Sequence, residues 1–430
     1  INIDGNMRTH TNNQHWAVLP VYAHDADGAP YAISWDGGAS YSPGASRVME
    51  SRYIEDYFTT NFYTDYAKTI GDHYFKVMVG FNAELTKYDT MSGQGDKLIS
   101  AETPYLGQTT SEQKVSGGRA ENAVAGFFGR INYNYKERYM IELNGRYDGS
   151  SRFVGDKRWG FFPSVSVGWN LAREEFVGDL SELFSTLKVR GSWGQLGNTD
   201  TQDAWYPFYQ TMPTGTASGG WLINGVKPNV AGLPGIVSSL KTWETIESWD
   251  VGLDWALLNN RLTGSFDYFT RYTYDMIGPA PELPSVLGAT PPKINNSDMK
   301  SYGFELELSW RDRIGDFSYG AKFVLSDDQQ VITNYPNDSK SLDIAHYSGK
   351  KLNSIWGYTT VGIAQSQEEM DAHIANNRPS WGSNWSAGDI MYADLNGDGV
   401  VNSGANTVDN PGDRTIIGNS TPRYKFGLTL

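Results

Sequence analysis

The stretch YFKVMVGFNAELTK, residues 74–87, alternates apolar and polar side chains with a period of two. The odd positions carry the apolar residues Phe75, Val77, Val79, Phe81 and Leu85. The even positions include the polar residues Lys76, Asn82 and Glu84. Because successive side chains of a strand point to opposite faces, this pattern predicts a strand with one apolar and one polar face.

The same alternation recurs along the chain and predicts an all-β protein of eleven antiparallel strands. The predicted strands are 57–69, 74–87, 124–135, 139–148, 160–172, 187–196, 244–258, 261–275, 300–311, 316–328 and 424–430. Most are about as long as a tilted strand that crosses a bilayer, which needs about 9 to 11 residues, and longer than the soluble average of about 5 to 6. The pattern therefore favours a transmembrane β-barrel, in which the odd residues of 74–87 face lipid and the even ones face the lumen.

The connections between these strands are alternately short and long, as in outer-membrane barrels. The short ones are 70–73, 136–138, 259–260 and 312–315, and the long ones are 88–123, 197–243, 276–299 and 329–423. We therefore expect all short turns at one end of the barrel and all long loops at the other. A soluble two-sheet sandwich remains an alternative, because its strands show the same alternation.

Composition excludes several classes of protein. The 430 residues carry 35 Lys and Arg against 49 Asp and Glu, so the net charge of −14 argues against nucleic acid as a partner. The absence of Cys excludes disulfides and thiolate metal sites. Neighbouring carboxylates such as Glu174 and Glu175 point to opposite faces of a strand, and the six His lack metal-ligand spacing, so no catalytic site is predicted. The N-terminus shows no signal peptide, and we expect a mature chain or a part of a longer one.

Several segments resemble the barrel of the SusC/RagA-type TonB-dependent outer-membrane transporters of Bacteroidota. The motifs that carry the resemblance are 128–136 (FGRINYNYK), 146–153 (RYDGSSRF), 158–164 (RWGFFPS), 187–194 (LKVRGSWG), 244–254 (ETIESWDVGLD) and 394–399 (DLNGDG). They cover roughly residues 120–430, whereas 57–87 is only compatible as a first hairpin. The resemblance implies a barrel of about 22 strands. We therefore expect residues 1–430 to be a partial receptor barrel, without the plug domain, the TonB box and the final strands.

The resemblance also implies a function. It predicts a multi-pass β-barrel in the cell outer membrane, surrounded by lipid, that imports a nutrient oligomer, either an oligosaccharide or an oligopeptide. A SusD-like lipoprotein and TonB are the implied partners, and no enzymatic activity is expected. Two alternatives stay open: a secreted soluble β-protein that binds or cleaves carbohydrate, and a non-transporting barrel that serves as an adhesin or scaffold.

A calcium-type loop lies between the last two predicted strands. Asp394, Asn396 and Asp398 stand two residues apart before Gly399, as at the start of oxygen-ligand calcium loops, but Ala405 replaces the usual Glu at the twelfth position. We expect a structural Ca²⁺ held by these side chains, the Val400 carbonyl and a further carboxylate from Asp413 or Asp409. The alternative is an Asx-rich turn that binds no metal.

The long loops are rich in aromatic residues, which suit contacts with a substrate or with a lid protein. The candidates are Trp205, Tyr206, Trp221, Trp356 and Trp381. Internal packing of the loops is the alternative explanation for these rings.

Overall fold

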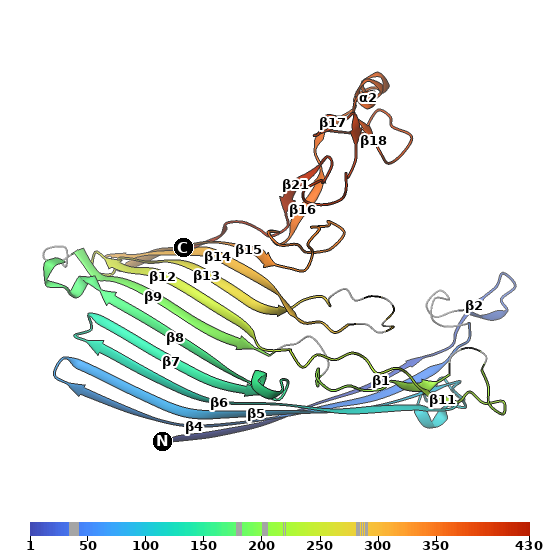
Figure 1. Cartoon of the computed structure of the whole chain (residues 1–430), viewed down its shortest axis with the longest axis horizontal. Helices are drawn as coiled ribbons and strands as arrows, with labels where there is room; N and C mark the ends of the chain where they lie inside the picture. Colours follow the sequence, from blue (N-terminus) through green and yellow to red (C-terminus); the bar gives the residue numbers. More distant parts are fainter. Residues whose placement is uncertain are drawn as a thin grey trace. The chain divides into compact units, whose positions relative to one another are not determined.

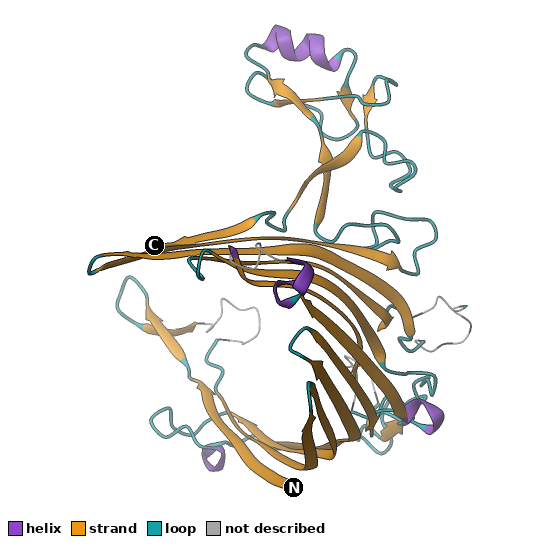
Figure 2. Cartoon of the chain, turned by 90° about the vertical axis from the view of Figure 1, so that its left-hand side faces the viewer, coloured by secondary structure: helices purple, strands orange, loops and turns teal. Residues whose placement is uncertain are grey.

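We describe the fold from a computed structural model of the chain. The described residues are 1–430 without 34–42, 178–182, 200–204, 218, 220, 281–283, 285, 287 and 289–290. Strands make up most of the chain, with short helical turns between them (Figure 2).

Among these residues, the largest sheet has twelve strands in the order β1-β4-β5-β6-β7-β8-β9-β12-β13-β14-β15-β22. Their bounds are β1 (Asn2–Val18), β4 (Arg47–Ile70), β5 (His73–Asp96), β6 (Lys114–Tyr135), β7 (Tyr139–Ser150), β8 (Trp159–Asn170), β9 (Phe184–Asn198), β12 (Glu244–Leu257), β13 (Leu262–Ile277), β14 (Asn295–Ile314), β15 (Phe317–Asn334) and β22 (Lys425–Thr429). Each of the eleven predicted strands is present. The count of eleven was one too low, because β1 was missed.

The chain divides into two compact units. The first comprises Ile1–Asp65, Val79–Phe128 and Tyr147–Arg152, and the second comprises Tyr66–Met78, Gly129–Arg146 and Phe153–Leu430. In the first unit, β1 pairs with β4 along its whole length, and the hairpin of β2 (Val21–His24) and β3 (Pro30–Ile33) follows. In the second unit, β12 to β15 lie side by side as consecutive antiparallel hairpins (Figure 1).

The apolar face of the second unit's sheet carries exposed side chains. Val251 of β12 pairs with Tyr268 of β13, and the two side chains are 60% and 49% exposed. Phe75 and Val77 of β5 are 40% and 42% exposed. The other sheets formed by described residues have only two strands each, so no second layer covers this face. The soluble sandwich is therefore wrong, and the apolar face has the character expected of a lipid contact.

Contacts between turns test the predicted topology in the second unit. The 136–138 turn contacts the 70–73 turn, where the Lys136 amide donates to the Asp72 carbonyl (3.0 Å), and Arg261 pairs with Asp312 of the 312–315 turn (3.4 Å). Among the long loops, the Thr242 amide donates to Asn295 Oδ1 (3.1 Å). Short turns therefore contact short turns and long loops contact long loops, as predicted. The predicted loop 329–423 contacts 276–299 as well, where Asn334 Nδ2 donates to the Asn296 carbonyl (3.3 Å). The predicted loop 88–123 belongs to the first unit and was too long, because β5 and β6 extend into it and leave only 97–113 as the connection.

A small apolar cluster forms where two of the long connections contact β8. Phe153, Phe162 of β8 and Trp243 form it, and the Trp243 Nε1–H donates to the carbonyl of Arg158 (3.3 Å), the last residue of η2 (Gly155–Arg158). The loop between β9 and β12 also contains the pair β10 (Thr214–Thr216) and β11 (Asn229–Ala231). Short 3₁₀ turns η1 (Leu106–Gln108), η3 (Leu171–Arg173) and η4 (Glu175–Val177) complete the connections.

The predicted loop 329–423 contains a small lobe of its own, which sequence periodicity did not reveal. Its elements are β16 (Ser354–Tyr358), β17 (Thr360–Ile363), α2 (Gln367–Ile374), β18 (Arg378–Pro379), β19 (Ile390–Tyr392), β20 (Val400–Val401) and β21 (Arg414–Asn419). Its core consists of Ala364, Met370 and Met391, with Trp385 packed against them. The Ser366 side chain caps α2 by accepting from the Glu369 amide. No helix in the described part of the chain is long and apolar enough to cross a membrane.

Candidate functional site: a hollowed polar wall

The register of the strands places charged residues together on the polar face of the second unit's sheet. Asp250 of β12 pairs with Ser192 of β9, and Gly252 lies between Arg190 of β9 and Asp267 of β13. Directly paired residues share a face, so the side chains of Arg190, Asp250 and Asp267 all lie on the face opposite the exposed apolar one.

Arg190 is the centre of this polar face. Its Nε donates to Asp254 Oδ2 (3.1 Å), its Nη1 to Asp250 Oδ1 (3.3 Å) and its Nη2 to Asp267 Oδ2 (2.7 Å). A single guanidinium therefore binds three carboxylates, and the group as a whole keeps a negative charge. Gly252 makes room for it, because a Cβ at this position would lie 2.6 Å from the Arg190 Cζ.

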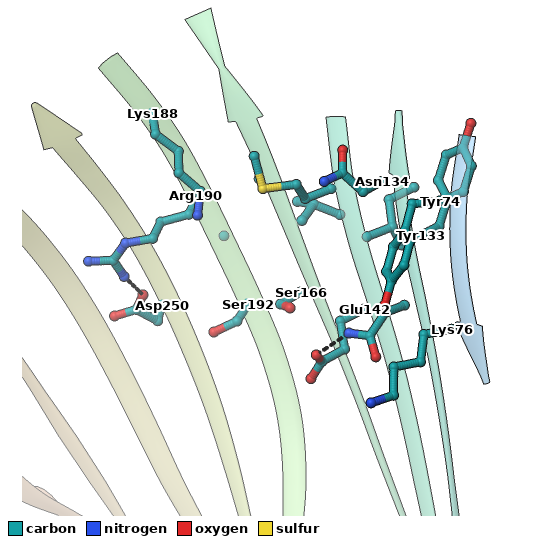
Figure 3. A pocket seen from close by; sticks show the side chains of 16 residues that line it. Tyr74, Lys76, Tyr133, Asn134, Glu142, Ser166, Lys188, Arg190, Ser192 and Asp250 are labelled. Carbon is teal, nitrogen blue, oxygen red and sulfur yellow. Dashed lines mark hydrogen bonds and ion pairs between the residues drawn. The ribbon is translucent and has the colours of Figure 1, made fainter. Parts of the chain in front are cut away.

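A hollow of about 500 Å³ lies beside this cluster, lined by residues of β5 to β9 and β12. Figure 3 shows Lys76, Glu142, Lys188 and Asp250 around it, together with the hydroxyls of Ser166 and Ser192. Asn132, which also lines the hollow, donates to Glu142. Cations, anions, amides and hydroxyls therefore line the hollow together with apolar groups such as Tyr74 and Met140, so it can hold a solute that forms hydrogen bonds and also offers it apolar contact.

In the loop predicted to bind calcium, the carboxylates accept hydrogen bonds from backbone amides. Asp394 accepts from the Gly397 and Gly399 amides at 2.6 and 2.7 Å. The Gly399 amide is the main reason that the pKa of Asp394 lies below its ordinary value. Asp398 accepts from the Val400 amide (2.8 Å), and Asn396 Nδ2 donates to Asp398 Oδ2 (3.0 Å).

Of the two candidates for the further carboxylate ligand, Asp413 contacts this loop. Its fully buried side chain accepts from the Leu395 amide (2.8 Å) and the Asn402 amide (2.7 Å). Asp409 instead pairs with Lys340 at 3.6 Å. The Val400 carbonyl accepts from Asn402 Nδ2 (2.9 Å). The described residues contain no group of three or more His, Cys, Asp or Glu arranged to hold a metal, and calcium binding by this loop stays a prediction.

The aromatic candidates lie in two separate segments of the chain. Trp356 and Trp381 belong to the lobe, where the Trp356 Nε1–H donates to the Tyr347 hydroxyl (3.2 Å) and the Trp381 ring lies 4.4 Å from the Tyr358 ring. Trp205, Tyr206 and Trp221 lie in the loop between β9 and β12, and Trp221 is 60% exposed. The two lobe residues therefore pack internally, and substrate contact by any of the five remains a prediction.

Sequence reasoning did not select the Arg190 cluster as functional. The signal was present, because Lys188 and Arg190 stand two apart on β9, and Asp250 and Asp254 stand four apart on β12. Both spacings put the pairs on one face of a strand. The alignment of β9 with β12 and β13 was the missing information.

Comparisons with known proteins agree with this architecture. The family model described as "TonB dependent receptor-like, beta-barrel" matches residues 2–430. TonB-dependent receptor P3 of Formosa agariphila is 27% identical and covers 90% of this chain and 38% of its own length. TonB-dependent receptor SusC of Bacteroides thetaiotaomicron is 27% identical and covers 87% of this chain and 36% of its own length. The chain thus spans less than half the length of these relatives.

Solved structures show the same fold. The structure of the RagAB peptide transporter matches with a TM-score of 0.74 at 18% identity, over 99% of this chain and 43% of the other chain. Because the family model matches almost the whole sequence, the chain belongs to the TonB-dependent receptor-like β-barrel family and forms part of an outer-membrane barrel.

Proposed function

We propose that the protein containing this chain imports a nutrient oligomer, either an oligosaccharide or an oligopeptide, through the outer membrane. The chain supplies part of the barrel wall. TonB supplies the energy for transport, and a SusD-like surface lipoprotein works with the barrel at its extracellular end. The protein is a transporter and not an enzyme.

The hollowed polar wall is the observation that carries this proposal. One face of the sheet exposes large apolar side chains, and the opposite face is lined by ion pairs, amides and hydroxyls around a hollow of about 500 Å³. A lumen of this character suits a hydrophilic solute too large for a porin, whereas an adhesin or scaffold has no need of one. The fold shared with the RagAB peptide transporter, and the relatives named TonB-dependent receptors, support this proposal.

Uptake by cells tests the proposal. The gene is deleted in its source bacterium, and uptake of fluorescent oligosaccharide and oligopeptide pools is compared with that of the parent and of the complemented strain. We expect one pool to be taken up only when the gene is present, and only when TonB is functional. Equal uptake of both pools by the deletion and parent strains would show that the protein does not import them.

A further inference from the structure

The apolar face of two neighbouring strands in the first unit, β5 and β6, ends partway along each strand. On β5 the apolar series of odd residues ends at Leu85 and is followed by Lys87 and Asp89. On β6 the charged residues Arg119 and Glu121 occupy the same face. Asp89 and Arg119 form an ion pair at 2.7 Å, with 46% and 86% of their side chains exposed. A charge that faces hydrocarbon costs about 2–4 kcal/mol at midplane, so these segments lie beyond the hydrocarbon.

The strands are long enough to project from the membrane. β4 and β5 have 24 residues each and β6 has 22. A tilted span uses about 9 to 11 residues, so about 11 to 15 residues of each strand extend further, or roughly 35–50 Å at 3.3 Å per residue. They project at the end that carries the long connection 97–113, and long connections mark the extracellular end in barrels of this type. We call this part of the first unit the projecting wall, comprising residues 10–18, 47–56, 87–96 and 114–122.

The polar face of the projecting wall contains a hollow of about 400 Å³. Its lining is Asn12, Gln14, Ser51, Arg52, Tyr53, Thr90, Met91, Ser92, Ser116, Gly117 and Gly118. Asn12 pairs with Tyr53 and Gln14 with Ser51, so these four side chains share a face. Arg52 pairs with Asn13 and therefore points to the opposite face. The side chains that enter the hollow are thus uncharged, in a chain whose net charge is −14.

Hydroxyl groups line this hollow together with the Tyr53 ring, which contacts two further rings. Ser92 Oγ and Ser116 Oγ are 2.7 Å apart, and the Thr90 hydroxyl donates to the Gly118 carbonyl at 3.3 Å. The Tyr53 ring lies 5.9 Å from the Tyr88 ring and 6.4 Å from the His10 ring. The hollow therefore joins a strip of hydrogen-bonding groups to a small cluster of rings.

We propose that the hollow in the projecting wall is an extracellular binding site for an uncharged oligosaccharide, which resolves the choice of substrate class left open by the proposed import function. Sugar hydroxyls can bond to the Ser, Thr, Asn and Gln side chains, and the C–H faces of a sugar ring can pack on tyrosine. A sulfated glycan or the charged ends of a peptide find no ionic partner among the side chains that enter the hollow. The inference rests on the proposed function.

Gly118 allows a direct test. An added Cβ there would meet Thr90 Oγ1 at 3.5 Å, an ordinary contact, and the backbone is not left-handed. Gly118→Leu should therefore fold while filling the hollow. Gly107→Leu is the matched control, because Gly107 lies in the exposed turn η1 of the same unit with nothing within 4 Å of an added Cβ.

The experiment measures binding of the purified full-length receptor to an array of neutral hexasaccharides of glucose, mannose, xylose and galactose, with sulfated hexasaccharides and a tryptic peptide pool as further probes. We expect a neutral hexasaccharide to bind wild type and Gly107→Leu equally, and Gly118→Leu and Tyr53→Ala at least about tenfold more weakly. Heat-modifiable migration on gels shows that each variant is folded.

Three results would overturn the inference: no neutral hexasaccharide binds, the peptide pool or only a sulfated glycan binds, or Gly118→Leu retains wild-type affinity. Uptake separates this failure from that of the proposed function. If import depends on the gene but Gly118→Leu binds as wild type does, the import function is supported and the binding site is rejected. If Gly118→Leu loses binding but no import depends on the gene, the binding site is supported and the import function is rejected.

Discussion

At the scale of single residues, the positive charge of Arg190 offsets the repulsion among three neighbouring aspartate side chains. Arg190→Ala leaves Asp250, Asp254 and Asp267 facing one another on the polar wall. Charge-assisted hydrogen bonds contribute about 1.5–3 kcal/mol each, and water reaches this partly exposed site, so we expect a net loss of about 1–3 kcal/mol in the free energy of unfolding. Thermal unfolding in detergent measures it.

A second ion pair on the same face provides the control. Lys322 bonds to Glu307 at 2.7 Å, but both side chains are almost half exposed, so Lys322→Ala should cost less than about 1 kcal/mol. Asp267→Asn added to Arg190→Ala should recover part of the lost stability by relieving repulsion. If both single variants unfold at the same temperature, the Arg190 cluster does not stabilise the wall.

At the scale of elements, the loop 394–413 should lose its order in acid. The Gly399 amide, which donates to Asp394, is the largest cause of this carboxyl's lowered pKa. Because the folded pKa lies below the unfolded one, the stabilisation is complete above the ordinary value of 3.8 and disappears as the pH falls through the folded pKa. Pepsin cleavage within the loop should therefore increase below about pH 3.8. Asp394→Asn should make cleavage nearly independent of pH over this range, and an unchanged pH dependence in this variant would contradict the assignment.

The same loop should respond to calcium if the motif binds it. Hydrogen exchange of residues 394–402 should slow when about 1 mM Ca²⁺ replaces a chelator, as for extracellular sites with dissociation constants of about 10⁻⁴ to 10⁻³ M. Asp398→Asn should weaken this response, whereas Asp409→Asn should not, because Asp409 pairs with Lys340 outside the loop. Identical hydrogen exchange with calcium and with chelator would mean that the motif is an Asx-rich turn that binds no calcium.

Strands with a regular period were predictable from sequence, and the exceptions have physical causes. β1 was missed because its odd positions carry Thr9, Thr11 and Asn13, so it lacks an apolar face over much of its length. The lobe was missed because its strands have two to six residues, too short to show a period. The Arg190 cluster depends on the register of three strands, which no local pattern encodes. Of the two candidates for a further carboxylate, Asp413 contacts the loop by accepting from the Leu395 amide, and metal binding by it stays a prediction.

At the scale of the whole molecule, the barrel requires one face in lipid and the other in water. Neighbouring positions in the β9–β12 pair test this requirement: Val251, 60% exposed on the apolar face, and Ser192, which lines the polar hollow beside it. Val251→Lys should cost about 2–4 kcal/mol, because the ammonium group would lie in hydrocarbon. Ser192→Lys should be tolerated, because its added charge faces the hydrated hollow near Asp250.

The measurement is the amount of heat-modifiable, folded receptor in the outer-membrane fraction of cells that express each variant. We expect Ser192→Lys to accumulate like wild type and Val251→Lys to be reduced or degraded, since a misfolded barrel is not retained in the membrane. Val251→Ala controls for the lost side-chain volume and should assemble normally. Equal accumulation of the two lysine variants would mean that the apolar face meets water or another protein chain rather than lipid, and the reversed result would mean that the polar and apolar faces have been assigned the wrong way round.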